Sequence, residues 1–315
     1  MNESTQGDPA MKSPQVNPPR RQTQTYLMEL LTSQGLRAKK DFGQNFLIDL
    51  NLLDLLVRSS PITKRDVVLE VGAGTGGLTS RLVEHAGRVV SVEIDHGFFA
   101  LASSEVENAR NVTLLRADAL AGKNRIEPAV MEAVASAMKE MGVDHYHLVA
   151  NLPYDIASSI IANAILHELS IRSLTFTVQL EVGQRILAEP GSRDYGPLSI
   201  LAQTVGSATL LRTLSPKAFW PRPKVDSAFV RIDVDPLKEP DRTDLARFHR
   251  FIRDLFTHRR KNIRGSLMSL PEFKPLKNEI PVWLEELGIS RDDRAEVISP
   301  AKLRELYQQL TKRDG

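Results

Sequence analysis

Short apolar runs rich in β-branched residues recur along the chain from residue 67 and alternate with stretches whose apolar residues repeat at helical spacing. The runs that predict strands cover residues 67–71, 89–94, 112–115, 147–150 and 174–178. Strands that alternate with helices predict a parallel, doubly wound (Rossmann-like) sheet, so the expected fold class is α/β. An amphipathic helix is expected over residues 129–141, as an insertion before the fourth strand.

The pattern changes after residue 209. Strand-like runs at 210–211 and 228–232 precede a charged linker with two prolines, and the remainder of the chain predicts only helices. The N-terminal segment is rich in proline and polar residues and cannot bury enough apolar surface to offset its ordering entropy, so we expect disorder there. The expected parts are a tail over 1–23, an α/β domain over 24–238 and a smaller all-helical C-terminal domain over 239–315.

Composition narrows the class of protein. The chain has 315 residues, 42% hydrophobic and 25% charged, which suits a globular protein of about two domains. It has no cysteine, which excludes disulfides, thiolate metal sites and cysteine nucleophiles. It shows no apolar stretch near the ~18 residues that span a bilayer and no secretory signal, so we expect a cytoplasmic protein without membrane contact. A net charge of +2 alone does not indicate nucleic acid, because the distribution of charge matters more.

A glycine-rich loop follows the first predicted strand. Gly72, Gly74 and Gly77 let the backbone turn tightly and let a ligand approach closely. Glu93 ends the next strand, where a carboxylate can accept both hydroxyls of a ribose. Asp118 ends the third strand, well placed to bind an adenine amino group. These features predict a nucleoside site at the carboxyl edge of the sheet.

A polar and aromatic turn, Asn151-Leu152-Pro153-Tyr154, follows the fourth strand. Pro153 fixes its own φ and restricts the residue before it, so the carbonyls of the turn point in set directions. Asn151 offers a side-chain acceptor, and Tyr154 offers a face on which a base can stack. The turn therefore suits a flat ring with an amino group. An ordinary strand-to-helix turn with a buried tyrosine is the alternative, since four-residue motifs recur by chance.

Two cofactor classes suit the glycine loop. The glycines also satisfy the GxGxxG pattern of dinucleotide enzymes, so a dehydrogenase stays open on the glycines alone. Carboxylate-tipped strands followed by an amine-binding turn favour a nucleoside cofactor beside an amine acceptor. S-adenosylmethionine fits, because it has a ribose, an adenine and a sulfonium but no phosphate. The combination favours a methyltransferase.

These residues make the chain resemble the ribosomal RNA adenine dimethyltransferases, from about Lys40 to the C-terminus. The resemblance rests on motifs at 43–47, 70–76, 151–154, 219–227, 259–261, 294–296 and 299–300. It implies that the chain dimethylates N6 of two adjacent adenosines in the 3′-terminal hairpin of small-subunit (16S) RNA. The implied partner is the 30S subunit late in its assembly, with the protein acting as a monomer.

The resemblance also implies roles for single residues. Asn45 and the backbone of Leu47 would close over the cofactor, and Gly72 would approach its methionine part. Asn151 would lie between cofactor and target. Glu93 and Asp118 would hold the ribose and the adenine, in agreement with their places at the strand ends.

The expected catalytic residues are Asn151, Leu152, Pro153, Tyr154 and Phe219. If the Asn151 side chain and a carbonyl of the Leu152–Pro153 turn accept the two N6 hydrogens, the nitrogen becomes tetrahedral and its lone pair is freed. The target base must leave its stack to reach this turn, and Tyr154 and Phe219 are expected to sandwich it. The alternative for Phe219 is a hydrophobic plug beneath its loop.

A basic stripe is expected to bind the RNA. Its members fall at spacings that predict one side of a single helix, and few acidic residues lie beside them: Arg250, Arg253, Arg260 and Arg264, joined by Arg259 and Lys261. Tracking of phosphates is the favoured role, and a solvated charged face is the alternative. Arg37, Lys39 and Lys40 are expected to extend this surface.

Three further expectations concern alternatives and metals. The basic motifs of the C-terminal region favour the small-subunit branch over the erythromycin-resistance relatives, which methylate large-subunit RNA. A binding protein of the same fold that serves ribosome assembly or transcription stays open. His145 and His147, on one predicted strand, are the only histidines at the spacing of two metal ligands; we expect them to be structural and expect no metal.

Overall fold

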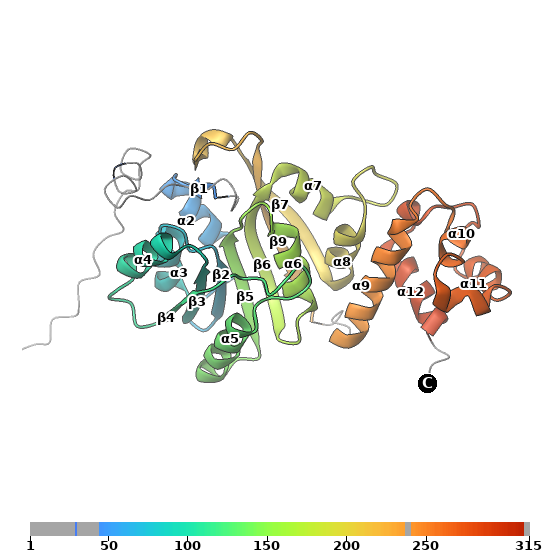
Figure 1. Cartoon of the computed structure of the whole chain (residues 1–315), viewed down its shortest axis with the longest axis horizontal. Coiled ribbons are helices and arrows are strands. Elements are labelled where there is room, and N and C mark those ends of the chain that lie inside the picture. The colour runs from blue at the N-terminus through green and yellow to red at the C-terminus, as the bar shows by residue number, and fades with distance from the viewer. Residues whose placement is uncertain (1–28, 30–43, 237–240, 312–315) are drawn as a thin grey trace, which may run out of the picture.

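The computed structural model of the chain describes residue 29 and residues 44–236 and 241–311 (Figure 1). The expected N-terminal tail and the basic residues Arg37, Lys39 and Lys40 lie outside the described residues. The expected domain boundary also falls outside them, so the division into domains stays a prediction.

A seven-stranded sheet forms the centre of the molecule, in the order β4-β3-β2-β5-β6-β9-β7 (Figure 1). Its strands are β2 (Val67–Val71), β3 (Arg88–Glu93), β4 (Val112–Arg116), β5 (His145–Asn151), β6 (Ser170–Gln179), β7 (Gly206–Leu214) and β9 (Ser227–Val234). The strands from β4 to β6 pair in parallel, and β9 runs antiparallel between β6 and β7. The expected parallel, doubly wound α/β sheet is confirmed, with the strand positions correct to within a few residues.

Helices alternate with these strands. They are α2 (Leu50–Arg58), α3 (Gly77–His85), α4 (His96–Glu105), α5 (Pro128–Met141), α6 (Ala157–Leu166), α7 (Leu180–Leu187) and α8 (Pro197–Val205). Local chemistry sets where they begin and end. Asp95 starts α4 by accepting hydrogen bonds from the backbone N–H groups of Gly97 and Phe98, and Gly142 ends α5 in the left-handed conformation.

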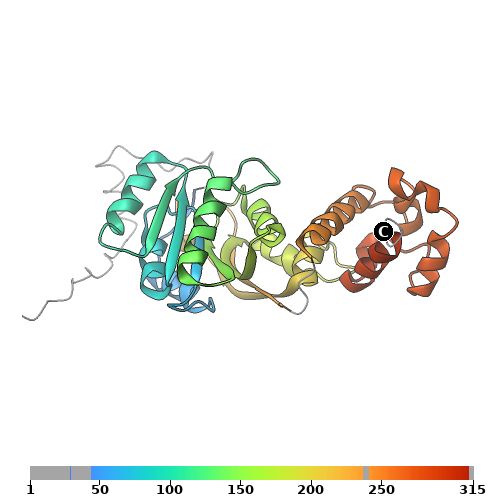
Figure 2. The ribbon, with the colours of Figure 1, turned by 90° about the horizontal axis from the view of Figure 1, so that it is seen from below.

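Two hydrophobic clusters cover the two faces of the sheet, because side chains along a strand alternate between faces. Val67 and Leu69 of β2 belong to a cluster that includes buried residues of α5, α6 and α8. Val68, between them, belongs to a second cluster with residues of α2 and α3. Figure 2 shows the helices on either side of the sheet. Burial on both faces explains why the strands are hydrophobic runs without alternation.

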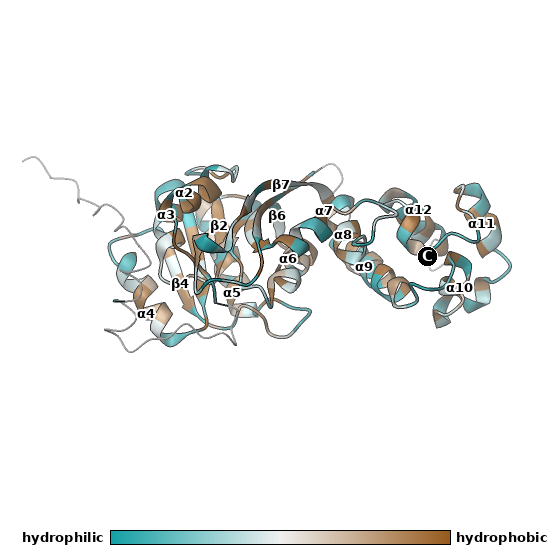
Figure 3. Cartoon of the chain, turned by 90° about the horizontal axis from the view of Figure 1, so that it is seen from above, coloured by the Kyte–Doolittle hydropathy of each residue, from teal (hydrophilic) through white to brown (hydrophobic). Residues whose placement is uncertain are grey.

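Among the described residues of the C-terminal part, helices are the only regular secondary structure, and this part lies at one end of the molecule (Figures 1 and 2). It contains α9 (Arg242–Thr257), α10 (Ile263–Leu267), α11 (Ile280–Glu286) and α12 (Pro300–Thr311), with short 3-10 segments η3 (Pro271–Leu276) and η4 (Ala295–Val297). Its helices carry both hydrophobic and hydrophilic positions (Figure 3). The apolar positions join the same cluster that covers the sheet, and the Tyr195 hydroxyl donates to the carbonyl of Ile298 at 2.9 Å.

The expected single basic helix is wrong. Helix α9 ends at Thr257, and α10 begins only at Ile263. The break has a local cause, because the Asn262 side chain accepts a hydrogen bond from the N–H of Gly265 at 2.8 Å and so caps a new helix. The expected RNA-binding residues therefore lie on α9, on the connecting turn and on α10, and all are exposed: Arg250, Arg253, Arg259, Arg260, Lys261 and Arg264.

A small second sheet, which the sequence did not indicate, holds the segment that precedes α2. It pairs β1 (Phe46–Leu47) with β8 (Phe219–Trp220) in antiparallel register, with Leu47 opposite Phe219. The Phe219 side chain is 2% exposed and belongs to the cluster with Leu47, Leu56 and Phe229. The structure therefore does not place Phe219 as one half of a base sandwich. Its ring anchors β1 to the core, in agreement with the plug alternative.

This packing predicts the effect of removing the Phe219 ring. Phe219→Ala is expected to lower the free energy of unfolding by about 3–5 kcal/mol, because a buried aromatic leaves a cavity. It is also expected to weaken cofactor binding, since β1 carries one wall of the site described below. Chemical denaturation and calorimetric titration measure both effects. Unchanged stability together with loss of RNA methylation alone would favour base stacking instead.

Candidate active site

A cavity opens at the carboxyl edge of the parallel strands. Its walls come from the segment that enters β1, the loop after β2, the ends of β3 and β4, and the turn after β5. Most of the expected site residues line it: Asn45, Gly72, Glu93, Asp118, Asn151, Leu152 and Pro153. The structure thus brings together motifs that lie far apart in the sequence.

Close backbone contacts explain the glycines of the loop. Gly72 has a φ of +84°, and a Cβ there would come within 3.4 Å of the Pro153 ring. Gly74 has a φ of +56°, and a Cβ there would lie 2.9 Å from the ring of Phe46. The loop therefore touches the turn after β5 on one side and β1 on the other. A side chain at either glycine would be strained and would intrude on these contacts.

Glu93 has the geometry expected of a ribose-binding carboxylate. It is 5% exposed, and its two oxygens accept hydrogen bonds from the N–H groups of Gly74 at 2.8 Å and Asp95 at 2.9 Å. Burial raises the pKa of Glu93, while these backbone bonds oppose the rise. Each oxygen has a second lone-pair site, so the carboxylate can still accept hydroxyl groups of a ligand. The backbone bonds fix its position against the glycine loop.

Asp118 also lines the cavity and follows the end of β4. Its side chain is exposed, and one carboxylate oxygen accepts a hydrogen bond from the N–H of Leu120 at 2.9 Å. The bond fixes the carboxylate at the cavity wall and leaves the other oxygen accessible. This placement suits the recognition of an amino group on an adenine ring.

The side-chain amide of Asn151 has its orientation set by a hydrogen bond to the backbone of Asn45. Its Nδ2 donates to the backbone carbonyl of Asn45 at 2.9 Å. A carbonyl can only accept, so the NH2 group must face it and the oxygen must point elsewhere. That oxygen, Oδ1, is buried and has no hydrogen-bond partner among the described residues. A buried acceptor without a donor is costly in a folded protein, so a donor from a ligand would satisfy it at the cavity wall.

The remaining expected site residues do not line the cavity. Leu47 is buried in the cluster with α2, and Phe219 lies beside it, as described above. Tyr154 is half-buried, and its hydroxyl forms a hydrogen bond of 2.5 Å with Ser227. Ser227 begins β9, so the bond fixes the tyrosine ring against the sheet. The side chain of Tyr154 does not line the cavity itself.

Glu70 is an additional polar residue that the sequence analysis did not single out. It lies fully buried in β2, where one oxygen accepts from the hydroxyls of Thr79 at 2.7 Å and Ser91 at 2.6 Å. Its other oxygen is buried without a partner among the described residues. The sequence does contain a sign of this role, because Glu70 is the one acidic residue in an otherwise apolar strand that leads into the glycine loop. Its hydroxyl partners tie β2 to β3 and to α3 beneath that loop.

The expected RNA-binding residues divide into two groups. Arg250, Arg260 and Arg264 form no hydrogen bond or ion pair with any described residue. The other members have protein partners. Arg259 is bound most firmly, since it forms a 2.6 Å ion pair with Glu296 and donates to the carbonyl of Arg193 at 2.7 Å. The three unpaired arginines are therefore the members best able to meet phosphates.

Comparisons with known proteins identify the family of the chain. A family model described as ribosomal RNA adenine dimethylase matches residues 35–312. The ribosomal RNA small subunit methyltransferase A of Shouchella clausii is 34% identical over 289 residues, which cover 90% of this chain and 95% of that protein. The enzyme of the same name from Staphylococcus carnosus is 35% identical over 293 residues, covering 92% and 96%.

Solved structures show the same fold. A dimethyladenosine transferase from Plasmodium falciparum aligns with a TM-score of 0.69 at 22% identity, covering 84% of this chain and 97% of that chain. The 23S rRNA methyltransferase ErmE aligns with a TM-score of 0.59 at 24% identity, covering 84% and 99%. At these identities the likeness concerns the fold.

The sheet order and the glycine loop define a Rossmann-like fold, and the family match makes the chain a methyltransferase that uses S-adenosylmethionine. The family match covers most of the chain, and the relatives named above exceed 30% identity. The chain belongs to the ribosomal RNA adenine dimethylase family. A dehydrogenase, which the glycines alone left open, is excluded by this membership.

The buried Glu70 makes stability depend on pH. Burial raises its pKa from 4.5 to about 7, so the folded chain holds a proton that the unfolded chain has lost between these values. The free energy of unfolding is therefore expected to fall as pH rises through this range, by on the order of 3 kcal/mol. Glu70→Gln cannot ionise and keeps an oxygen for both hydroxyls. The melting temperature of Glu70→Gln minus that of the unaltered chain should increase from pH 5 to pH 8. A difference that stays constant over this range would contradict the raised pKa of Glu70.

Proposed function

We propose that the chain transfers two methyl groups from S-adenosylmethionine to N6 of each of two adjacent adenosines near the 3′ end of small-subunit ribosomal RNA. Family membership supports the reaction, and the names of the relatives support the small subunit as its location. The observation that carries the proposal is that Oδ1 of Asn151 is buried at the cavity wall and has no partner among the described residues.

The cavity fits the cofactor by its donors and acceptors. Glu93 would hold the ribose hydroxyls, Asp118 the adenine amino group and the Gly72 backbone the methionine part. Asn45 would close the cavity over the ligand, and Leu47 would support it from the core. When bound, S-adenosylmethionine supplies a methyl group activated by its sulfonium. The protein residues therefore need to align the acceptor nitrogen, and alignment alone contributes several kcal/mol to such reactions.

Asn151 makes the adenine amine nucleophilic. The lone pair of N6 is delocalised into the ring, so the amine reacts poorly in its planar form. Asn151 Oδ1 would accept one N6 hydrogen, and a backbone carbonyl of the Leu152–Pro153 turn would accept the other. These two bonds pull the nitrogen towards a tetrahedral shape and free its lone pair. The Nδ2 bond to Asn45 prevents the amide from turning its NH2 group towards the amine.

A neutral acceptor also suits the second methylation. After the first transfer only one hydrogen remains on N6, and an amide oxygen demands fewer donors than a carboxylate. Tyr154, held by Ser227, would stack on one face of the flipped base. Phe219 would support β1 and would not stack on the base, because its ring is buried in the core.

The RNA surface lies on the helical part of the chain. Arg250, Arg260 and Arg264 are exposed and have no partner in the part of the chain that the structure describes, so they can neutralise phosphates at little cost to the fold. A cavity beside α9 adds further positive charge, since its lining includes Arg185, Arg193, Arg253 and Arg259 with a single acid, Asp194. Lys261 donates to the Ser269 hydroxyl at 2.7 Å, so it supports the turn between α9 and α10.

The proposed substrate also indicates where the protein acts. We infer that it acts as a monomer on the assembling 30S subunit in the cytoplasm. Across residues 44–236 and 241–311, no helix is both long and apolar enough to cross a bilayer. A purely binding role in assembly or transcription is the second candidate. The oriented and unsatisfied amide of Asn151 favours catalysis over that role.

The Asn151 amide gives a direct test of the reaction. Asn151→Ala is expected to lower the rate of methylation by about 100-fold or more, the usual scale for a group that stabilises a transition state. Cofactor affinity should fall by less than roughly tenfold, because other residues hold the ribose and adenine. Labelled S-adenosylmethionine and unmethylated small subunits, followed by mapping of the modified nucleotides, measure the rate. The exposed Asn108→Ala is the matched control.

Asn151→Asp separates the two methylations. We expect monomethyladenosine to accumulate, because a carboxylate demands more donors than the singly methylated amine has. Mass spectrometry of the isolated hairpin gives the ratio of the two products. Equal slowing of both steps would show that the neutral amide has no special role in the second transfer.

The unpaired arginines predict the salt dependence of RNA binding. Replacing Arg260 and Arg264 together with glutamine should reduce the slope of log affinity against log salt by roughly 1–2, since each phosphate contact contributes about 0.7–0.9. Filter binding over a range of salt concentrations measures the slope. Arg58 and Arg65, both exposed and remote from α9 in the sequence, give a control of equal charge change. An unchanged slope in the test variant, or an equal change in both, would reject the surface.

A further inference from the structure

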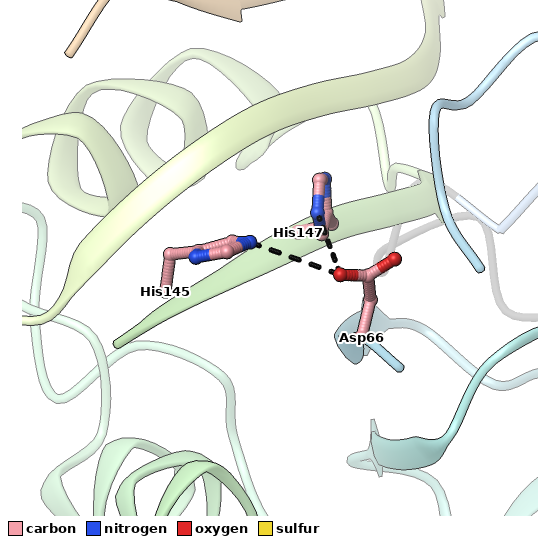
Figure 4. A group of neighbouring side chains, drawn as sticks. All are labelled: Asp66, His145 and His147. Carbon is pink, nitrogen blue, oxygen red and sulfur yellow. Dashed lines mark ion pairs between the residues drawn. The ribbon is translucent and has the colours of Figure 1, made fainter. Parts of the chain in front are cut away.

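Asp66, His145 and His147 form a cluster of two imidazoles and a carboxylate (Figure 4). They lie at the amino ends of β2 and β5, whereas the cofactor cavity lies at the carboxyl ends of these strands. His145 and His147 are on β5 and share one face, because side chains two residues apart along a strand point the same way. Asp66 immediately precedes β2, whose first residue pairs with Tyr146 between the two histidines. The parallel pairing of β2 and β5 therefore adds a third potential ligand that the histidine spacing did not reveal.

The distances within the cluster suit a metal ion better than hydrogen bonds. The Nε2 atoms of His145 and His147 each lie 3.7 Å from the same oxygen of Asp66, Oδ1. That separation is too long for a hydrogen bond. It is close to the ~3.4 Å that separates two ligand atoms on a tetrahedral zinc ion with bonds of about 2.1 Å. The three ligand atoms all lie within 4.8 Å of one another.

The atoms of these three side chains that face away from the centre of the cluster have hydrogen-bond partners that fix the orientation of each side chain. His145 Nδ1 lies 2.7 Å from the carboxylate of Asp144, so this nitrogen carries the hydrogen and Nε2 has a free lone pair. His147 Nδ1 forms a 2.7 Å hydrogen bond with the Ser173 hydroxyl. The backbone N–H and the hydroxyl of Thr63 both donate to Oδ2 of Asp66, which leaves Oδ1 to face the rings. Metal-binding histidines have partners of this kind on their second nitrogen.

Charge and access also suit a cation. Asp66 and Asp144 supply two negative charges against one nearby cation, Arg172. The His145 side chain is 22% exposed and that of Asp66 is 14% exposed, so an ion can reach the cluster from solvent and keep a water ligand.

We propose that Asp66, His145 and His147 form a site for one divalent transition-metal ion. Two imidazole nitrogens and one carboxylate oxygen, with a fourth position open to water, best match Zn²⁺. The ion joins the start of β2 to the start of β5 and is not part of the cofactor cavity. Its expected effect is to stabilise the folded chain, because it binds a site that exists only when the two strands are paired.

Binding of the metal alone to the full, untagged chain tests the proposal. After removal of metals with a chelator, calorimetric titration with ZnCl2 should show one site per chain with a dissociation constant in the micromolar range or below. Saturating Zn²⁺ should raise the melting temperature. Co²⁺ in place of Zn²⁺ should give the visible absorption bands of a tetrahedral site.

Two variants that spare the buried ring distinguish this site from general surface binding. His145→Ala and Asp66→Asn should each weaken Zn²⁺ binding by at least tenfold and abolish the rise in melting temperature. His145 is partly exposed, and asparagine keeps an oxygen for the Thr63 donors, so both variants are expected to fold. His85→Gln, an exposed histidine on α3, is the matched control and should bind as the unaltered chain does. Absence of binding, or binding that both variants retain, would overturn the proposal.

Discussion

The hydrogen bond from the Asn151 amide to the Asn45 carbonyl is the interaction on which the site depends. It joins two segments 106 residues apart and decides which end of the amide faces the cavity. With the NH2 group occupied, the oxygen is left buried without a described partner, and the site is prepared for a donor before any ligand arrives. An isolated Asn151 on the turn after β5 would have no such preference. Reactivity therefore depends on where the chain before β1 is held.

That position is set by the small sheet of β1 and β8. Leu47 and Phe219 pair across it and are both buried in the cluster with α2. Two residues in each strand provide few backbone hydrogen bonds, so side-chain burial supplies most of the stability. Phe219 therefore holds the segment whose carbonyl orients Asn151, and its effect on the proposed reaction would be exerted through that segment.

The strand order and most of the cavity follow from the sequence, because burial on both faces leaves continuous apolar runs and parallel strands gather their polar ends at one edge. Glu93 and Asp118 were predictable for that reason. Phe219 was not, since the same aromatic residue suits a base or a core until the partner of its strand is known. The break between α9 and α10 was also missed, although Asn262, a good cap residue, precedes Gly265 by one helical turn. Arginine spacing alone cannot show where a helix ends.

The pairing of β2 with β5 places chemistry at both edges of the sheet. At the carboxyl edge it brings Gly72 to the Asn151 turn, and at the amino edge it brings Asp66 to His145 and His147. The two ends of β5 are roughly 20 Å apart, from the rise of a parallel strand. An ion at the amino edge would therefore touch no residue of the cofactor cavity. It can act only by holding together the strands that carry the catalytic turn.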